Sequence, residues 1–515
     1  MIIPEKCREA VQRSGVIRRR LAAGVLFSFA VLSASCSTPY GKPAGHALTT
    51  DVTVAAHNGP AEICPNTCPA PPPRPTDQSV EPSSLQQVEP PEPLLPPDYE
   101  LNDVRTIPQE FGIYPPSANG LLSSTCRDEL KSEFRKRYFS PWDKGPPLFD
   151  TVQTAEDMKK ELGKEWFGEN RRRVPVKIIE SLRENCDLGR LPALNRRAIT
   201  VVATNMRVLP TNRPMYKQPD GFPFDMLQQS GVKLNEPLRV LHQSRDGLWV
   251  YAESSYASGW IDARDVAYPD ESMVSWWRNA EQAVIVSDMI SLKDVAGAFV
   301  RIAKIGTLLP IARETEDYFE AYTAARTEPN GGVYEVLVRI PKKTAAERHP
   351  IAFNDTQIAR IGNQMIGTPY GWGELFNDRD CSALVRDFFL PFGIWLPRGS
   401  YDQGNSGRTI VLNGKSPEEK ARIILEKGVP FLTLVWLKGH IMLYVGSREG
   451  KPLVFHDLWG VTVKDSEGKR AKQIVGKAVI TTLTPGSELA LATGPLLAKI
   501  SKIRIITGNC APAAR

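Results

Sequence analysis

The chain has 515 residues, of which 42% are hydrophobic, and its formal net charge is +6 at pH 7. This length allows two to four domains, and the hydrophobic content is typical of globular chains and excludes a wholly disordered one. The charge is small for the size, so we expect no nucleic-acid partner.

The N-terminal segment has the pattern of a secretion signal. Three arginines, Arg18 to Arg20, precede an apolar run of about 15 residues, which is short for a membrane span but suits the apolar core of a signal. The run ends in small residues at Cys36. It resembles a bacterial lipoprotein signal, which implies cleavage before Cys36 and lipidation of that residue. Ser37 then favours sorting to the outer membrane, facing the periplasm. The alternative is an ordinary secreted or membrane-tethered protein.

A proline-rich segment follows, from residue 37 to about residue 116. It contains PAPPPRP and EPPEPLLPP and lacks the apolar periodicity needed for a core. We predict a disordered tether that lets an anchored protein search a volume near the wall. A proline-rich ligand for a partner domain is the alternative.

Residues 117–196 are predicted to be mainly helical. Helical patterns cover residues 128–139 and 154–163, and we expect Thr154 to cap the second helix, with Glu156 and Asp157 in its first turn. The nearby FSPW motif resembles the small N-terminal domain that accompanies certain cell-wall peptidases.

Two stretches of short β-prone runs come next, at 197–270 and 271–350. In the first, TVVA, PLRVLHQS, GLWVYAES and SGWIDARDVAY are separated by turn signals such as Asp246-Gly247. The pattern resembles a bacterial SH3-like barrel, and the second stretch resembles a more divergent one. Such barrels bind cell wall, serve as scaffold or help to build a substrate cleft.

Cys381 is the strongest candidate for chemistry. It opens the segment CSALVRDFFL, in which apolar residues recur at helical spacing, so it lies in the first turn of a predicted helix. The N-terminus of a helix favours a thiolate. Asp380 is placed to cap this helix and to contact a substrate amine. Because its charge opposes thiolate formation, a cation must lie close by.

Two of the six histidines complete the pattern. His440 begins the β-prone run HIMLYVG, and His456 lies near the end of KPLVFHD, with a turn-like SREG between the runs. A hairpin of these runs can bring both imidazoles to one side of a sheet. His440 is then the general base, and His456 orients it. Taken singly, each of these residues is more often structural than catalytic.

Residues 351–470 resemble the NlpC-type cell-wall cysteine peptidases through the segments GTPYGWG, DCSALVRDFF, LPRGSYDQ, GHIMLYVG and VFHDLWG. The resemblance implies a papain-like fold with Cys381 as nucleophile, His440 as base and His456 as the third polar residue. In relatives that cleave free muropeptides, a tyrosine and the two residues flanking the cysteine recognise an N-terminal L-Ala. The expected substrate contacts are therefore Tyr370, Asp380 and Ser382, together with Arg398 and Ser400 of LPRGSYDQ. No cofactor and no metal are implied.

The chain departs from the family pattern in one loop. Residues 372–379 carry Glu374, Asn377, Asp378 and Arg379, where many relatives have glycines. We expect this charged loop to border the cleft and to affect substrate preference. Ala383, where the family often has glycine, is small enough for close packing.

The cysteines fit an oxidising compartment without fixing the disulfides. Removal with the signal, lipidation and catalysis account for Cys7, Cys36 and Cys381, which leaves an odd number. Local pairing of Cys64 with Cys68 and pairing of Cys126 with Cys186 are possible connectivities.

Together these patterns predict an α+β multidomain chain. The expected segments are a signal at 1–36, a tether at 37–116, a helical domain at 117–196, two SH3-like barrels at 197–270 and 271–350, and a papain-like NlpC-type domain at 351–515. The expected function is a monomeric, lipid-anchored endopeptidase that hydrolyses murein stem peptides at the bond between γ-D-Glu and diaminopimelate or lysine. An amidase or acyltransferase with the same Cys-His core, or a wall-binding protein without activity, are the alternatives.

Overall fold

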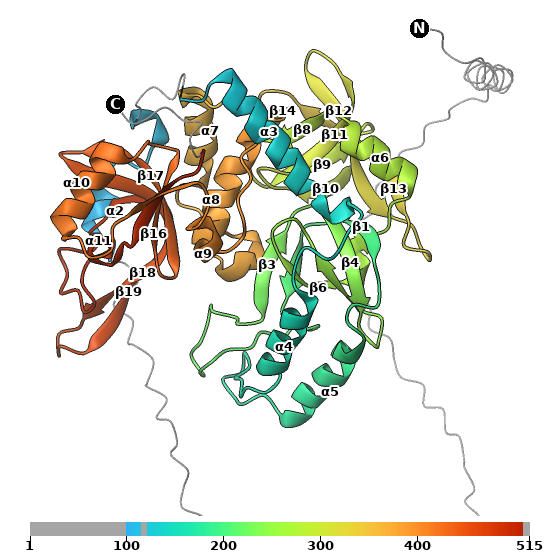
Figure 1. The fold of residues 1–515 in the computed structure, drawn as a ribbon, viewed down its shortest axis with the longest axis horizontal. Coiled ribbons are helices and arrows are strands. Elements are labelled where there is room, and N and C mark those ends of the chain that lie inside the picture. Colours follow the sequence, from blue (N-terminus) through green and yellow to red (C-terminus); the bar gives the residue numbers. More distant parts are fainter. Residues whose placement is uncertain (1–98, 115–120, 508–515) are drawn as a thin grey trace, which may run out of the picture. The chain divides into compact units, whose positions relative to one another are not determined.

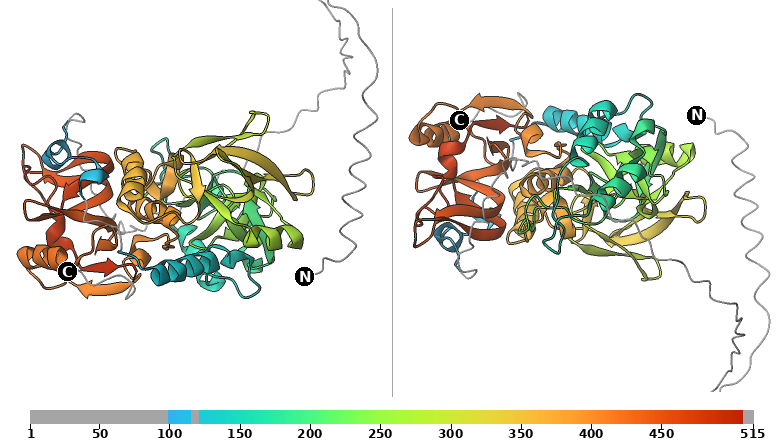
Figure 2. Two further views of the ribbon diagram at one scale, coloured as in Figure 1. Left: turned by 90° about the horizontal axis from the view of Figure 1, so that it is seen from above. Right: turned by 90° about the horizontal axis from the view of Figure 1, so that it is seen from below.

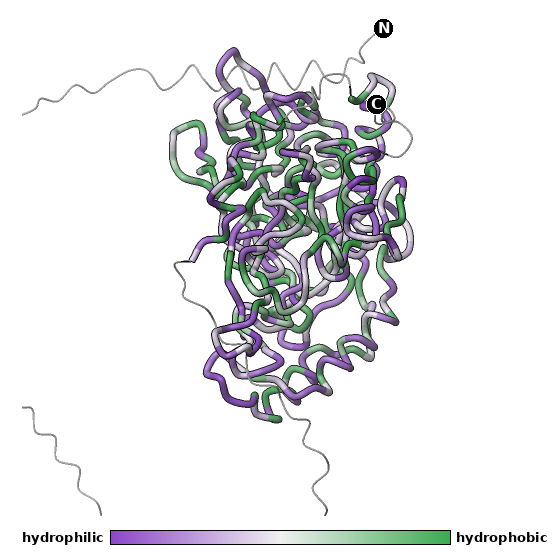
Figure 3. The backbone as a smooth tube through the Cα atoms, turned by 90° about the vertical axis from the view of Figure 1, so that its left-hand side faces the viewer, coloured by the Kyte–Doolittle hydropathy of each residue, from purple (hydrophilic) through white to green (hydrophobic). Residues whose placement is uncertain are grey.

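The structure is a computed structural model that describes residues 99–114 and 121–507. The predicted signal with Cys36, most of the tether, Cys64, Cys68 and Cys510 lie outside the described residues. Hydrophobic and hydrophilic stretches alternate along the described chain (Figure 3). Elements that alternate in this way bury one face against a neighbouring layer.

The first described segments are helical. They are α2 (Asn102–Thr106), α3 (Ser124–Tyr138), α4 (Thr151–Glu161) and α5 (Val176–Cys186). The cap predicted for α4 is wrong: Asp150, not Thr154, accepts the backbone N–H groups of Val152 and Gln153, so the cap lies four residues earlier than expected. A carboxylate is an equally good cap, and its negative charge is also stabilised by the positive end of the helix dipole.

Residues 99–114, which we predicted as the end of the tether, are folded. Phe111 is buried, and its ring lies 4.8 Å from that of Phe455. The side chain of Asp103 accepts hydrogen bonds from the backbone N–H and the hydroxyl of Thr482. These contacts could not be predicted from the sequence, because the segment adjoins a proline-rich stretch and its few apolar residues show no clear periodicity.

Two seven-stranded antiparallel sheets follow. The first has the order β3-β2-β6-β5-β4-β1-β7, and the second has the order β10-β9-β13-β12-β11-β8-β14. The first contains β1 (Arg196–Thr200), β2 (Thr204–Arg207), β3 (Gln228–Val232), β4 (Pro237–Gln243), β5 (Trp249–Glu253), β6 (Ser258–Asp262) and β7 (Val266–Ala267). After α6 (Glu271–Asn279), the second contains β8 (Gln282–Ile285), β9 (Ile290–Asp294), β10 (Phe299–Ala303), β11 (Leu308–Glu314), β12 (Tyr318–Arg326), β13 (Val333–Pro341) and β14 (Ala346–Arg348).

The C-terminal part is an α+β domain with a six-stranded antiparallel sheet of order β15-β20-β16-β17-β18-β19. Its strands are β15 (Arg408–Val411), β16 (Thr433–Leu437), β17 (His440–Arg448), β18 (Lys451–Lys464), β19 (Arg470–Thr482) and β20 (Lys502–Ile505). Its helices are α7 (Asp355–Met365), α8 (Cys381–Phe389), α9 (Ser400–Gln403), α10 (Pro417–Lys427) and α11 (Leu496–Lys499). The predicted hairpin is confirmed: β17 and β18 pair up to Arg448 and Lys451, and the two turn residues between them have positive φ.

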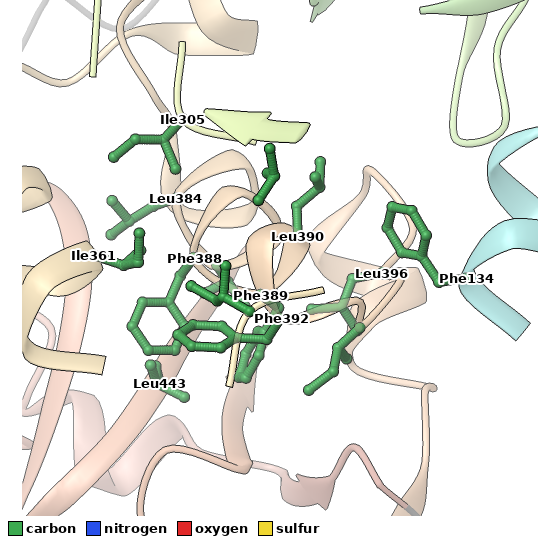
Figure 4. Packing of buried hydrophobic residues seen from close by; sticks show 14 of the residues in the cluster. Phe134, Ile305, Ile361, Leu384, Phe388, Phe389, Leu390, Phe392, Leu396 and Leu443 are labelled. Atoms are coloured by element: carbon green, nitrogen blue, oxygen red, sulfur yellow. The ribbon is translucent and has the colours of Figure 1, made fainter. Parts of the chain in front are cut away.

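Helix α8 packs against the sheet at β17 and β18 (Figures 1 and 2). Leu384, Phe388 and Phe389 are fully buried, and Figure 4 shows them among Ile361 of α7, Leu443 of β17 and Phe392. The same cluster includes Phe134 of α3 and Ile305 of the second sheet domain. The helix that carries Cys381 is therefore held by apolar contacts from several parts of the chain.

Buried charges also hold this helix. Asp387, on α8, accepts Lys233 Nζ at 2.5 Å from the first sheet domain and Arg379 Nε at 2.9 Å. Arg379 in turn bonds Asp288 of the second sheet domain. Burial alone would raise the pKa of Asp387, but Lys233 and the surrounding arginines hold it well below the usual value.

Replacing Asp387 by alanine is expected to lower the free energy of unfolding by about 3–5 kcal/mol, because Lys233 and Arg379 would keep buried charges without this partner. Glu426→Ala, which removes an exposed pair with Arg422, is the control and should cost less than about 1 kcal/mol. Urea unfolding followed by tryptophan fluorescence compares the two variants. Equal losses would show that the buried pairs contribute no more than a surface pair.

Candidate active site

Cys381 is the first residue of α8. The N-cap is Asp380, whose Oδ1 accepts the backbone N–H groups of Ser382 at 3.1 Å and Ala383 at 2.9 Å. The predicted cap is therefore confirmed. Cys381 is 9% exposed, so its thiol lies at the helix N-terminus in a largely enclosed position.

The two predicted histidines meet. Nε2 of His440 lies 2.8 Å from Nδ1 of His456, and Nε2 of His456 lies 3.0 Å from the hydroxyl of Thr481. The backbone N–H of Ile441, next to His440, hydrogen-bonds the sulfur of Cys381. Because His456 occupies Nε2 of His440, Nδ1 is the nitrogen left for exchange with the thiol.

Both reactive groups are neutral at pH 7. Burial, followed by the charge of Asp380, raises the pKa of the Cys381 thiol to about 12. Burial lowers the pKa of His440 to about 4 and that of His456 well below its usual value. A neutral imidazole beside a thiol can act as a base, so this arrangement suits proton transfer during attack better than a resting ion pair.

Asp380 is already saturated by protein groups. Besides the helix N–H groups, its oxygens accept Arg398 at 2.7 and 3.1 Å and the backbone N–H of Gly373 at 3.2 Å. The cation that Asp380 requires is therefore Arg398, not a histidine. These bonds argue against the direct contact between Asp380 and a substrate amine that we expected, because an ammonium would have to displace Arg398.

Arg398 itself is enclosed. It is 8% exposed and also donates to the hydroxyls of Ser230 and Ser382, at 2.9 and 2.8 Å. Its guanidinium thus links LPRGSYDQ to the helix N-cap and to the first sheet domain. The sequence resemblance places Arg398 among the substrate contacts. It could not indicate that Arg398 is buried, because a partner as distant along the chain as Ser230 leaves no local pattern.

Of the residues that we expected at the cleft in the loop of residues 372–379, Glu374 and Arg379 are buried, whereas Asn377 is exposed and Asp378 is half-buried. Glu374 is 4% exposed and binds Arg386 at 2.8 Å and Arg398 at 3.0 Å, and Arg379 is 1% exposed. Glu374, Phe376 and Asn377 have positive φ, which costs energy in residues other than glycine. The chain holds this strained loop through contacts with the first sheet domain, such as Gln228 Nε2 to the Gly373 carbonyl at 2.9 Å.

Tyr370 stands beside an aromatic group drawn from two domains. Its ring lies 5.6 Å from Trp459, and Trp459 lies 5.6 Å from Phe224, which also contacts Trp372 at 5.2 Å. Phe224 belongs to the first sheet domain, in a loop fixed by the buried Arg207–Asp225 pair. A wall from that domain therefore adjoins Tyr370.

The remaining expected residues are placed as follows. Ser382 is buried, and its hydroxyl donates to Asp380 at 3.0 Å. Ser400 begins α9 and is half-buried.

Among residues 99–114 and 121–507, no group of three or more His, Cys, Asp or Glu side chains has the arrangement of a metal site.

Asp457 is a residue of this region that sequence reasoning missed. It follows His456 in β18, is fully buried, and neither carboxylate oxygen hydrogen-bonds any described residue. Burial raises its pKa well above the usual value, and the charge of Asp380 adds to this effect. Adjacency to His456 was the one available signal, but strand alternation pointed its side chain away from that histidine.

The cysteines outside the site differ from one expectation. Cys126 is disulfide-bonded, whereas Cys186 is a free, buried thiol, so the two do not pair. Burial raises the pKa of Cys186 to about 12.

No helix of the described chain is long and apolar enough to cross a membrane.

Comparison with protein families covers four parts of the chain. Residues 79–190 match the N-terminal stabilising domain of NlpC/P60 proteins, residues 214–262 match an SH3 domain of SH3b1 type, and residues 270–316 match an SH3 domain of SH3b2 type. Residues 367–476 match the NlpC/P60 family. These matches, with the fold, define a multidomain cysteine peptidase. Residues 367–476, which contain Cys381, His440 and His456, are therefore assigned to an NlpC/P60 domain.

A solved structure shares this fold, and a second one is similar to a lesser degree. An NlpC/P60 endopeptidase from Photobacterium damselae subsp. piscicida is 22% identical with a TM-score of 0.70, and the match covers 82% of this chain and 100% of that chain. An NlpC/P60 family protein from Bacillus cereus ATCC 10987 is 15% identical with a TM-score of 0.39, covering 60% of this chain and 98% of that one. No curated protein matches. The predicted order of a helical region, two SH3-like domains and an NlpC-type domain is confirmed.

Asp457→Asn is expected to stabilise the protein at pH 8 but not at pH 4. A carboxyl whose pKa is raised on folding binds its proton more tightly in the folded chain, so stability falls as pH rises above about 4, the unfolded value. Asparagine cannot ionise, so the variant does not lose this stability. The loss in the unsubstituted protein is about 1.4 kcal/mol for each unit by which the folded pKa of Asp457 exceeds the unfolded value.

Thermal unfolding at the two pH values measures this effect, with the exposed Asp317→Asn as the matched control. A difference between Asp457→Asn and the unsubstituted protein that is the same at pH 4 and pH 8 would refute the assignment of a raised pKa.

Proposed function

We propose that the protein is a cysteine endopeptidase of murein stem peptides, which hydrolyses the bond between γ-D-Glu and diaminopimelate or lysine in peptides with a free N-terminal L-Ala. The observation that carries this proposal is the position of Cys381 at a helix N-terminus, next to β17, whose His440 is hydrogen-bonded to His456 of β18. The match to the NlpC/P60 family supports the same chemistry.

In the proposed reaction, His440 takes the thiol proton as Cys381 attacks the γ-carbonyl carbon of D-Glu. The backbone N–H of Cys381 and the Tyr370 side chain are the proposed donors to the resulting oxyanion. His440 then gives its proton to the leaving amine, and the carbon–nitrogen bond breaks to leave a thioester. Water, deprotonated by His440, hydrolyses the thioester and releases the thiol. His456 keeps the His440 ring oriented throughout.

The first SH3-like domain supports the proposed preference for free peptides. Phe224 joins Trp459 and Trp372 beside Tyr370, so this side of the site is walled by bulky rings. A stem peptide still attached to a glycan strand is wider at its N-terminal end than a free peptide. We assign Tyr370 and Ser400 to substrate contact, and we assign Asp380, Ser382 and Arg398 to holding that surface in place.

Cys381→Ala is expected to abolish hydrolysis of L-Ala-γ-D-Glu-diaminopimelate, with a loss of about a thousand-fold or more, because the nucleophile is gone. Mass spectrometry of the peptide, free and carried on muramic acid, follows release of L-Ala-γ-D-Glu. Cys186→Ala is the matched control, since it removes the other free, buried thiol of the described chain and should leave the rate unchanged.

Cleavage of the free peptide alone would support the preference for a free N-terminus, and cleavage of both would contradict it. Transfer of the acyl group to an added amine in preference to water would favour the acyltransferase alternative. An unsubstituted protein that cleaves neither peptide would contradict the proposed activity and favour wall binding without catalysis.

We also propose that Cys36 is the site of lipid attachment and that the protein is anchored in the envelope, facing the periplasm from the outer membrane. The basic and apolar segments that precede Cys36 support this proposal.

Cys36→Ala should move the mature protein from the detergent phase to the aqueous phase, because it removes the residue that bears the lipid. Phase partitioning after expression of the full chain measures this, with Cys7→Ala as control. Membrane association that is unchanged in Cys36→Ala would refute the anchor.

A further inference from the structure

Two adjoining hollows, of about 470 and 320 Å³, lie where α6 meets the second SH3-like domain, and both are lined by Trp276 and Glu335. Tyr268 and Asp270 line the larger hollow, and Tyr322 lines the smaller one. We call these five residues the Trp276 surface. It is separate from the residues of the candidate active site, none of which lines either hollow.

The strand register and the helix build this surface together. Tyr322 pairs with Leu337 and Ala324 pairs with Glu335 across β12 and β13, so Tyr322 and Glu335 share one face of the sheet. Helix α6 lies against these strands, with the ring of Trp276 5.4 Å from Tyr322 (Figure 1).

Trp276 is not needed to fill the core. The inward face of α6 is formed by Met273, Val274 and Trp277, all of them buried, whereas Trp276 is 38% exposed. Its ring meets Trp277 and Tyr322 edge-on, so these neighbours do not stack on it face to face. An exposed tryptophan that stands between two hollows is typical of a binding surface.

Polar groups around the ring are free to bind. The carboxylate of Glu335, the indole N–H of Trp276 and the hydroxyls of Tyr268 and Tyr322 form no hydrogen bond or ion pair with any residue in the described part of the chain. Glu335 is exposed at the rim of both hollows. The surface thus combines flat aromatic area with several donors and acceptors. It carries negative charge from Asp270 and Glu335, and the guanidinium of Arg196 lies 3.7 Å from the centroid of the Tyr268 ring.

This combination suits a sugar. The face of a pyranose ring presents C–H groups that pack on an indole, while its hydroxyl and acetamido groups need both donors and acceptors. The two carboxylates disfavour an anion, such as the carboxylate-rich stem peptide. Two hollows on either side of one tryptophan fit consecutive units of a polymer.

We propose that the Trp276 surface binds the N-acetylated glycan strand of murein. This rests on the murein assignment of the proposed function, since the glycan is the other component of that polymer. Glycan binding here holds the protein on the wall polymer while the site at Cys381 works on peptides.

The test is titration of the full chain with soluble oligomers of N-acetylglucosamine, followed by calorimetry. Trp276→Ala should weaken binding by about ten-fold or more, because it removes the stacking face, and Glu335→Gln by a smaller factor. Trp276→Phe keeps an aromatic face and should restore part of the affinity. Phe299→Ala is the matched control, because Phe299 is an aromatic residue of the same domain, 63% exposed, that lines neither hollow.

The outcomes separate this inference from the proposed function. Hydrolysis of the free tripeptide by Trp276→Ala should be unchanged, which also shows that the variant is folded. Absence of oligosaccharide binding by the unsubstituted protein, or equal binding by Trp276→Ala, would overturn the glycan assignment even if the tripeptide is cleaved. Binding of a PAPPPRP peptide in place of the sugar would also overturn it and assign the surface to proline-rich ligands. Trp276-dependent sugar binding without tripeptide cleavage would refute only the proposed activity.

Discussion

The ion pair between Asp380 and Arg398 is the interaction on which the rest of the site depends. Asp380 caps the helix that begins with Cys381, and a buried carboxylate next to that thiol would be costly if its charge were not balanced. Arg398 supplies the balance at 2.7 Å and is fixed in turn by Ser230 of the first SH3-like domain. The helix N-terminus is therefore held in place by a residue of a different domain.

The same reasoning extends along α8. Arg386 pairs with Glu374 of the peptidase domain, and Asp387 pairs with Lys233 of the first SH3-like domain, so the last turn of the helix also carries buried charges whose partners lie elsewhere in the chain. Removing two charges from water costs several kcal/mol per ion, and only well-formed partners offset this cost. The SH3-like domains thus supply counter-charges to the peptidase domain, which a flexibly attached wall-binding module would not do.

Local signals made part of this site predictable. The helix at Cys381, its cap at Asp380 and the hairpin that joins His440 to His456 all follow from patterns within about twenty residues. The partners of Arg398 and the burial of Glu374 did not follow, because Ser230 lies 168 positions from Arg398 and such contacts leave no periodic trace. For the same reason a charged loop appeared solvent-exposed, and residues 99–114 were assigned to a tether. Composition describes a segment but not what packs against it.

The neutral states of Cys381 and His440 complete this picture. Enclosure raises the pKa of the thiol and lowers that of the imidazole, so the groups move away from a resting ion pair. The thiol form of Cys381 is therefore favoured over the thiolate. Proton transfer has to accompany bond formation to a substrate, and the geometry for this transfer is set by the 2.8 Å contact that fixes the His440 ring. Burial of these two groups thus keeps both of them neutral until a proton passes from the thiol to the imidazole.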